Sequence, residues 1–233
     1  MGNQKKTAGK FFVIVRWTAL IFVLWSVSGV VTYRFINPPF TFLMFKRTYQ
    51  QIAQGKPVKI ERQWKSLDEI SPHLVRAVIA AEDNNFPRHF GFDLAAMKNA
   101  LEHNQKSSRL HGASTITQQT AKNVFLWPRR SYVRKAFEFY FTFLMEVFWS
   151  KKRIMEVYLN VIETGPGIYG AEAAACRYFH KPASRLTPAE SALIAAALPA
   201  PRKRNPGNPS AYMLRRQAQI LDVMEKIGPI KWR

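Results

Sequence analysis

Apolar residues recur at helical spacing through most of this chain, whereas the alternating pattern of strands is rare. The clearest case is residues 71–83, where Ser71 and Pro72 form a typical helix start and the apolar positions that follow share one face. The same reasoning predicts further helices over 113–124, 134–148, 152–159, 187–198 and 211–227. We therefore expect one mainly α domain, without repeats or a long low-complexity linker.

An uncharged apolar run over 17–33 precedes this domain and is long enough to cross a membrane as a helix. Basic residues stand before the run without an acidic residue, namely Lys5, Lys6, Lys10 and Arg16. By the positive-inside rule, the N-terminus stays in the cytoplasm and the chain after Arg34 lies across the membrane. The alternative is a signal peptide cleaved at the small residues 26–28, and the domain is exported in both cases. A short apolar patch at 38–45 lies along the membrane interface or belongs to the domain core.

Composition narrows the choice of partner. The 233 residues suffice for one domain plus the anchor, and a hydrophobic share of 47% excludes a disordered chain. The formal net charge of +20 favours nucleic acid, anionic lipid headgroups or a phosphorylated substrate. Because an exported domain has no routine access to nucleic acid, lipid headgroups and pyrophosphate-linked lipids are the expected partners. The single cysteine, Cys176, cannot form an intramolecular disulfide and is expected to be a small buried core residue.

The densest group of chemically active side chains follows the helix over 71–83. Glu82 and Asp83 close this apolar helix, and His89 and Asp93 come soon after. A carboxylate at the edge of an apolar surface has a raised pKa, which suits a general base. The alternative is a solvated helix end beside a hydrogen-bonded histidine. A zinc site is not supported, because no second histidine lies at ligand spacing from His89.

Two later segments add groups that favour an anion. Hydroxyls, amides and a lysine gather at the helix start over 112–123, where free backbone N–H groups bind an anion or a sugar, or where an ordinary capped helix begins. Arg134 and Glu138 stand four residues apart in an aromatic stretch. They form either a surface ion pair or a cationic site beside a lipid-facing surface, and the aromatic residues around them pack in the core or face lipid.

Taken in order, these segments resemble the peptidoglycan glycosyltransferases, glycosyltransferase family 51, and most closely its monofunctional members. The four motifs that carry the resemblance lie at 82–93, 112–123, 134–138 and 151–160, and two further segments at 169–179 and 186–201 also match. The resemblance covers about 61–227. Thr120, Met155 and Thr164 depart from the family pattern without removing a polar group. The Ser-x-x-Lys and Lys-Thr-Gly motifs of transpeptidases are absent, so crosslinking is not expected.

The resemblance implies a lysozyme-like, mostly helical fold and inverting transfer that polymerises lipid II into β-1,4-linked glycan strands. In that mechanism Glu82 is the base that deprotonates the acceptor hydroxyl, and undecaprenyl pyrophosphate leaves. Four cations are candidates for the pyrophosphate clamp: Lys122, Arg130, Arg134 and Lys135. Glu138 assists either through a loosely bound divalent cation, Mg²⁺ or Mn²⁺, or by orienting these cations, and the sequence leaves both open. No organic cofactor is expected.

The remaining residues carried over from the family fall into two groups. The residues expected to line the sugar or phosphate cleft are Ser114, Thr115, Gln118, Gln119 and Asn123, and those expected to hold it in shape are Asp83, His89, Asp93 and Glu156. The chain is then divided into a basic cytoplasmic N-terminus at 1–16, a transmembrane helix at 17–36, a membrane-proximal segment at 37–60 and the glycosyltransferase domain at 61–233. It is expected in the cytoplasmic (inner) membrane as a single-pass protein with its domain in the periplasm or outside the cell.

The expected partners are lipid II, the growing lipid-linked strand, the membrane, and separate transpeptidases or division and elongation proteins, but no nucleic acid. Two rival interpretations remain. A lytic enzyme on a related scaffold also uses carboxylates, but it cleaves a glycosidic bond and has no pyrophosphate to neutralise. A non-enzymatic membrane scaffold uses only the basic face, and it predicts that Glu82→Gln has no effect.

Overall fold

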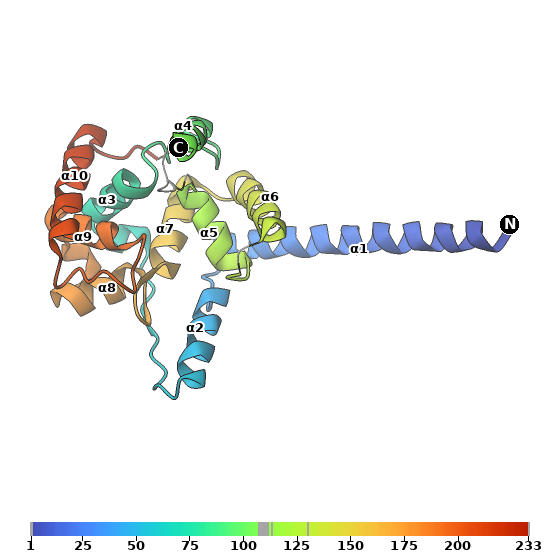
Figure 1. Ribbon diagram of the computed structural model, residues 1–233, viewed down its shortest axis with the longest axis horizontal. Coiled ribbons are helices and arrows are strands. Elements are labelled where there is room, and N and C mark those ends of the chain that lie inside the picture. Colours follow the sequence, from blue (N-terminus) through green and yellow to red (C-terminus); the bar gives the residue numbers. More distant parts are fainter. Residues whose placement is uncertain (1, 107–111, 113, 130, 233) are drawn as a thin grey trace. The chain divides into compact units, whose positions relative to one another are not determined.

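The computed structural model describes residues 2–106, 112, 114–129 and 131–232 (Figure 1). The chain divides into two compact units, Met1–Asn37 and Pro38–Arg233. The first unit contains helix α1, Gly2–Phe35, of which Phe12–Phe35 is long and apolar enough to cross a membrane by length and composition. A candidate anchor therefore lies where the uncharged run predicted it.

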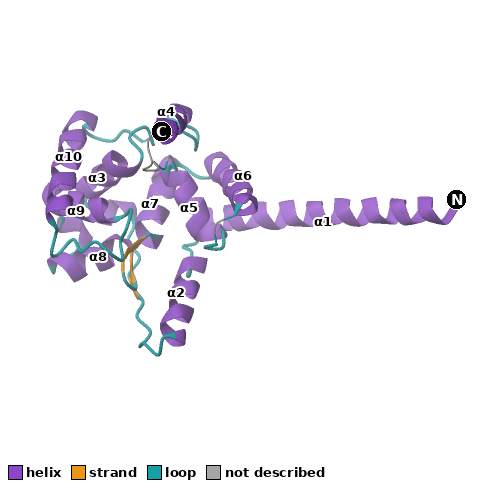
Figure 2. Ribbon diagram, in the orientation of Figure 1, coloured by secondary structure: helices purple, strands orange, loops and turns teal. Residues whose placement is uncertain are grey.

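The second unit is mainly helical, as the sequence predicts (Figure 2). Its α-helices are α2 (Phe42–Ala53), α3 (Pro72–Glu82), α4 (Leu94–Lys106), α5 (Ile116–Phe125), α6 (Tyr132–Phe148), α7 (Lys151–Val161), α8 (Gly170–Phe179), α9 (Pro188–Ala197) and α10 (Ala211–Ile227). Short 3-10 helices cover Leu67–Glu69 (η1) and Ala183–Arg185 (η2). A small sheet holds β1 (Glu61–Arg62) parallel to β3 (Ile168–Tyr169), and β3 antiparallel to β2 (Glu163–Gly165).

Short polar side chains set the starts of the predicted helices. The Ser71 hydroxyl accepts from the backbone N–H of His73 at the start of α3, and Thr187 forms a capping box at the start of α9. A second capping box, between Thr115 and Gln118, starts α5 three residues later than the periodicity suggests. Ser131 caps α6, which therefore begins two residues earlier than expected.

Helices α2, α4 and α8 and the sheet were not among the predicted elements. Helix α8 is rich in alanine and is buried over its first six residues, 170–175, so it has no polar face to create a helical period. Cys176 follows this buried stretch and is exposed, which corrects the expectation that it lies in the core. Helix α4 is largely exposed and mostly polar, so its apolar period is weak.

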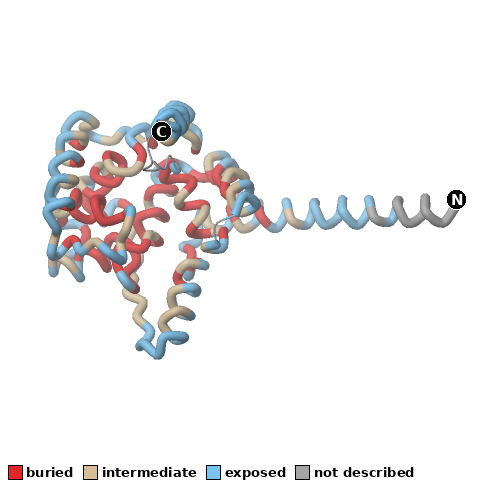
Figure 3. Tube along the Cα trace, in the orientation of Figure 1, coloured by how far each residue is buried: buried red, intermediate tan, exposed pale blue. Residues whose placement is uncertain are grey.

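Two groups of helices build the core around the site. Helix α3 packs against α9 and α10, and α5 packs against α6 and α7. The most deeply buried segments, coloured red in Figure 3, include α9 and much of α5, α7 and α8. The C-terminal end of α3 meets the N-terminal end of α5, which brings the first two sequence motifs together.

Candidate active site

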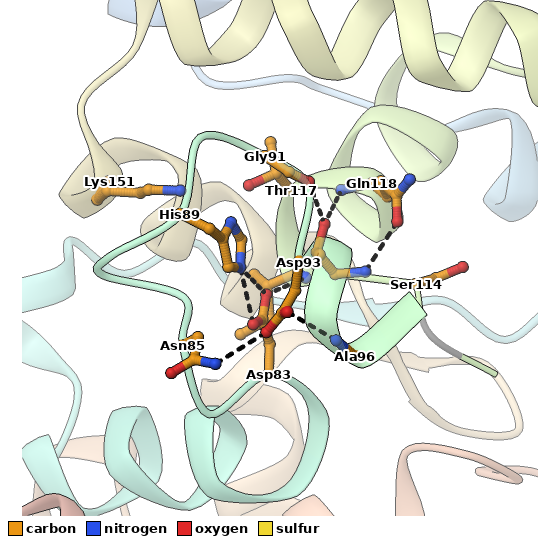
Figure 4. Close-up of polar contacts among 12 residues, drawn as sticks. Asp83, Asn85, His89, Gly91, Asp93, Ala96, Ser114, Thr117, Gln118 and Lys151 are labelled. Carbon is orange, nitrogen blue, oxygen red and sulfur yellow. Dashed lines mark hydrogen bonds and ion pairs between the residues drawn. The ribbon is translucent and has the colours of Figure 1, made fainter. Parts of the chain in front are cut away.

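Asp83, the residue that follows α3, joins the first motif to the second (Figure 4). Its side chain is only 2% exposed, and its carboxylate accepts from His89 Nε2 at 2.9 Å. The same carboxylate accepts from the backbone N–H of Ile116, the first residue of α5, at 3.0 Å. Asp83 therefore holds the loop after α3 against the start of α5.

The loop over 84–93 is closed by contacts at Gly91 and Asp93. The Thr115 hydroxyl donates to the carbonyl oxygen of Gly91 at 2.7 Å, and Gly91 has a φ of +75°. A Cβ atom at Gly91 would come within 2.7 Å of Thr142 Cγ2, so glycine is required for space as well as for backbone angle. Asp93 accepts from the backbone N–H of Ala96 at 2.8 Å and thereby caps α4.

A buried ion pair between Lys151 and Glu146 lies beside this loop. Lys151 Nζ donates to Glu146 Oε1 at 2.6 Å, and Thr117 Oγ1 donates to the same oxygen at 2.6 Å. The Lys151 ammonium also lies 4.6 Å from the centre of the Phe86 ring. Burial lowers the pKa of Lys151, and the hydrogen bond and charge of Glu146 oppose that shift. Glu146 was not among the site residues predicted from the sequence, although an acid inside an aromatic helix is a signal of a buried pair.

Glu82 ends α3 beside this network and has the environment expected of a base. Burial raises its pKa, while the hydrogen bond from Gln119 and the positive charges of Arg216 and Lys122 lower it. Gln119 Nε2 donates to Glu82 Oε2 at 2.8 Å, and Gln119 Oε1 accepts from the Tyr158 hydroxyl at 3.4 Å. Glu82 is therefore a partly buried carboxylate whose proton affinity several polar groups adjust.

Arg216, from α10, is a member of this site that sequence reasoning missed. It donates from Nη2 to the carbonyl oxygen of Ala81 at 3.3 Å and lines the same cavity as Glu82. An arginine on a polar helix face has nothing in its local sequence to separate it from a solvated one. Only the packing of α10 against α3 identifies its position.

Two cavities, each of about 570 Å³, meet at Ser114, which lines both. The first, here called the carboxylate cavity, is lined by the predicted residues Glu82, Asp83, Asp93, Ser114 and Thr115. The second, here called the cation cavity, is lined by the predicted residues Ser114, Gln119, Lys122, Asn123, Arg134, Lys135 and Glu138. Gln119 lines the second cavity and hydrogen-bonds Glu82 of the first, so the two cavities adjoin one another.

The cation cavity has an excess of hydrogen-bond donors. Arg134 Nη1 lies 2.8 Å and Lys135 Nζ 2.5 Å from different oxygens of Glu138, whose side chain is 4% exposed. Burial lowers the pKa of Lys122, and the Glu138 carboxylate opposes this shift. Within the described part of the chain, Asn123 Nδ2 and Arg134 Nε are buried and have no hydrogen-bond partner. The arrangement therefore suits a ligand that brings acceptor oxygens and negative charge.

Two further predicted site residues, Gln118 and Glu156, line neither cavity. Gln118 is 1% exposed, lines neither cavity and instead completes the cap of α5 through Thr115. Glu156 also lines neither cavity; it accepts from the backbone N–H of Leu67 at 3.1 Å and pairs with Arg153. It therefore supports η1 rather than the cleft. Arg130 lies outside the described residues.

The donor set around Glu138 does not fit a divalent cation held by the protein. Both of its carboxylate oxygens already accept from cationic groups, Arg134 and Lys135. The described residues contain no group of three or more His, Cys, Asp or Glu side chains that would hold a metal ion. Hard cations such as Mg²⁺ bind several oxygen ligands. The geometry therefore favours the second alternative from the sequence, in which Glu138 orients the cations.

The chain is similar to known proteins over most of its length. A family described as transglycosylase matches residues 48–225 of the chain. A biosynthetic peptidoglycan transglycosylase of Bacteroides thetaiotaomicron is 53% identical over 208 residues, which cover 89% of this chain and 84% of the relative. A protein of the same name from Xanthomonas campestris pv. campestris is 48% identical, over 92% of this chain and 89% of the relative. Another, from Shewanella oneidensis, is 49% identical, over 88% of this chain and 87% of the relative.

Proposed function

This chain belongs to the transglycosylase family, and on that premise we propose that it polymerises lipid II into glycan strands with Glu82 as the catalytic base. It is a peptidoglycan glycosyltransferase with a mainly α, lysozyme-like domain. The observation that carries the assignment of the site is the junction of the two cavities, where the partly buried carboxylate of Glu82 lines one cavity and a cluster of cations lines the other.

The chemistry follows from where the charges lie. The Glu82 carboxylate takes the proton of the acceptor sugar hydroxyl, whose oxygen forms a bond to the anomeric carbon of the growing strand. The bond from that carbon to the pyrophosphate breaks, and its electron pair leaves on the phosphate oxygen. Lys122, Arg134 and Lys135 line the cavity that receives this charge, and Arg130 belongs to the proposed clamp from its sequence position.

A single displacement inverts the anomeric carbon. The base lines one cavity and the cations line the other, so the attacking hydroxyl and the leaving pyrophosphate lie on different sides of the anomeric carbon. Retention requires a second carboxylate as a nucleophile. Glu138 does not serve as one in this proposal, because its oxygens are held by Arg134 and Lys135. We assign Glu138 the role of orienting those cations, with Ser114, Gln119 and Asn123 as further substrate contacts.

The membrane arrangement is part of the proposal. The helix Phe12–Phe35 supports an anchor, and the basic residues before it support a cytoplasmic N-terminus with the second unit on the other side of the cytoplasmic membrane. We propose four segments: a cytoplasmic N-terminus at 1–16, a transmembrane helix at 17–36, a membrane-proximal segment at 37–60 and the glycosyltransferase domain at 61–233. Separate transpeptidases or division and elongation proteins are proposed partners, since the chain lacks the transpeptidase motifs.

The test is polymerisation of labelled lipid II by the full chain in detergent. We expect Glu82→Gln to lower the rate about 10²- to 10⁴-fold, because a general base contributes that much. The matched control is Glu102→Gln on the exposed face of α4, which should keep the wild-type rate. Full activity of Glu82→Gln contradicts the assignment of the base. Release of fragments from finished sacculi, with no polymer from lipid II, moves the function to a lytic enzyme.

A further inference from the structure

Arg47 is a cation of the cation cavity that none of the family motifs in the sequence includes. It lies on α2, the first helix of the second unit, and lines the cavity together with Lys122, Arg134 and Lys135. Its side chain is 22% exposed. It is thus partly buried, and it also lines a second pocket of about 310 Å³ that contains Gln50 and Glu163.

Glu163 fixes the orientation of the Arg47 guanidinium. Arg47 Nε donates to Glu163 Oε1 at 3.1 Å, and Nη2 donates to Glu163 Oε2 at 2.9 Å. Glu163 is on β2, its side chain is 6% exposed, and it is separated from Arg47 by 116 positions in the chain. Gln50 accepts from Nη1 at 3.0 Å. A planar fork held at three nitrogens is preorganised, so binding a ligand costs little side-chain entropy.

This arrangement leaves donors for a ligand. A guanidinium carries five N–H groups, and Nη1 and Nη2 each have two of them. After the bonds to Gln50 and Glu163, each terminal nitrogen of Arg47 keeps one N–H that no other described residue accepts from. The same cavity contains the buried Asn123 Nδ2 and Arg134 Nε, which also have no partner among the described residues. Several unsatisfied donors on the residues that line one cavity favour a ligand with several acceptor oxygens.

We propose that Arg47 binds the phosphates of the lipid-linked substrate and that Glu163 is its positioning residue. This inference rests on the proposed function, since it names a further contact for the same pyrophosphate. It makes α2 part of the active site, although the sequence motifs begin only at Glu82. Because the diphosphate is already charged in the bound substrate, Arg47 binds it in the ground state as well as in the transition state. Its loss should raise KM more than it lowers kcat.

The decisive variant removes both charges of the pair. Arg47→Gln combined with Glu163→Gln leaves no uncompensated buried carboxylate, so we expect its unfolding temperature to stay close to that of the wild type. A hydrogen bond to a charged group contributes about 1.5–3 kcal/mol, which corresponds to a rise of at least about tenfold in the KM for lipid II. Inhibition by inorganic pyrophosphate should weaken by a similar factor. Lys59→Gln is the control for the loss of a basic side chain, because Lys59 pairs with Glu61 and does not line the cation cavity.

Two further measurements keep the inference separate from the proposed function and from folding. Protection of the full chain against thermal unfolding by inorganic pyrophosphate should occur in the wild type and in Lys59→Gln, and should weaken in the double variant. This assay needs no turnover. If the wild type makes no polymer, the proposed function is contradicted, but protection by pyrophosphate still tests the role of Arg47. If the double variant does not fold, Arg47→Lys decides, because it keeps the charge beside Glu163 and loses the fork. The inference is overturned if KM and pyrophosphate protection stay at wild-type values in the folded variant, or if only kcat falls.

Discussion

Replacing Asp83 by alanine tests whether the buried carboxylate holds the site together. Asp83 is 2% exposed and accepts from His89 Nε2 at 2.9 Å and from the backbone N–H of Ile116 at 3.0 Å. Asp83→Ala leaves both donors without their acceptor inside the protein. Losing two hydrogen bonds to a buried carboxylate costs about 3–6 kcal/mol of folding free energy, at about 1.5–3 kcal/mol each. In a chain of this size each kcal/mol corresponds to about 2–4 °C, so we expect the unfolding temperature to fall by about 6–24 °C.

The matched control is a second carboxylate of the same loop. Asp93 accepts from the backbone N–H of Ala96 at 2.8 Å, where it caps α4 near the surface. Loss of a helix cap costs about 0.5–2 kcal/mol, so Asp93→Ala should lower the unfolding temperature by only about 1–8 °C. The assay is thermal unfolding of the full chain in detergent, followed by tryptophan fluorescence. Equal shifts for the two variants would refute the argument that burial gives Asp83 its larger effect.

Three other predictions concern the base, the loop and the metal. Gln119→Leu removes the hydrogen bond that lowers the pKa of Glu82, so the acid limb of the polymerisation rate should move to higher pH; an unchanged midpoint contradicts this. Gly91→Ala should destabilise the chain by about 1–3 kcal/mol more than Gly55→Ala, since both glycines have positive φ but only Gly91 meets neighbours within 4 Å; thermal unfolding measures the difference. If Glu138 acts by orienting cations, EDTA should leave most of the polymerisation rate, and a loss restored by Mg²⁺ argues for a metal instead.

The local sequence determined where most helices begin. Ser71 with Pro72, and Thr187 with Glu190, are caps whose hydrogen bonds connect residues at most three apart, so no distant part of the chain is needed to form them. The same holds for Arg134 and Glu138, which one turn of α6 brings together. The order of the motifs was sufficient to indicate the family and to nominate Glu82 as the base.

Only the tertiary structure decided which groups that are distant in the sequence lie together at the site. Gln119 reaches Glu82 across 37 positions, and Glu163 fixes Arg47 across 116. Gln118, next to Gln119, belongs to the cap of α5 instead of the cavity, because successive residues on a helix point about 100° apart. The packing of whole helices fixed the direction of each side chain. When the apolar face of a helix is buried, the directions of its polar residues are set as well. The local pattern indicates a raised pKa at the end of the apolar helix, but the groups that oppose this shift at Glu82, namely Gln119, Arg216 and Lys122, come near it only through that packing.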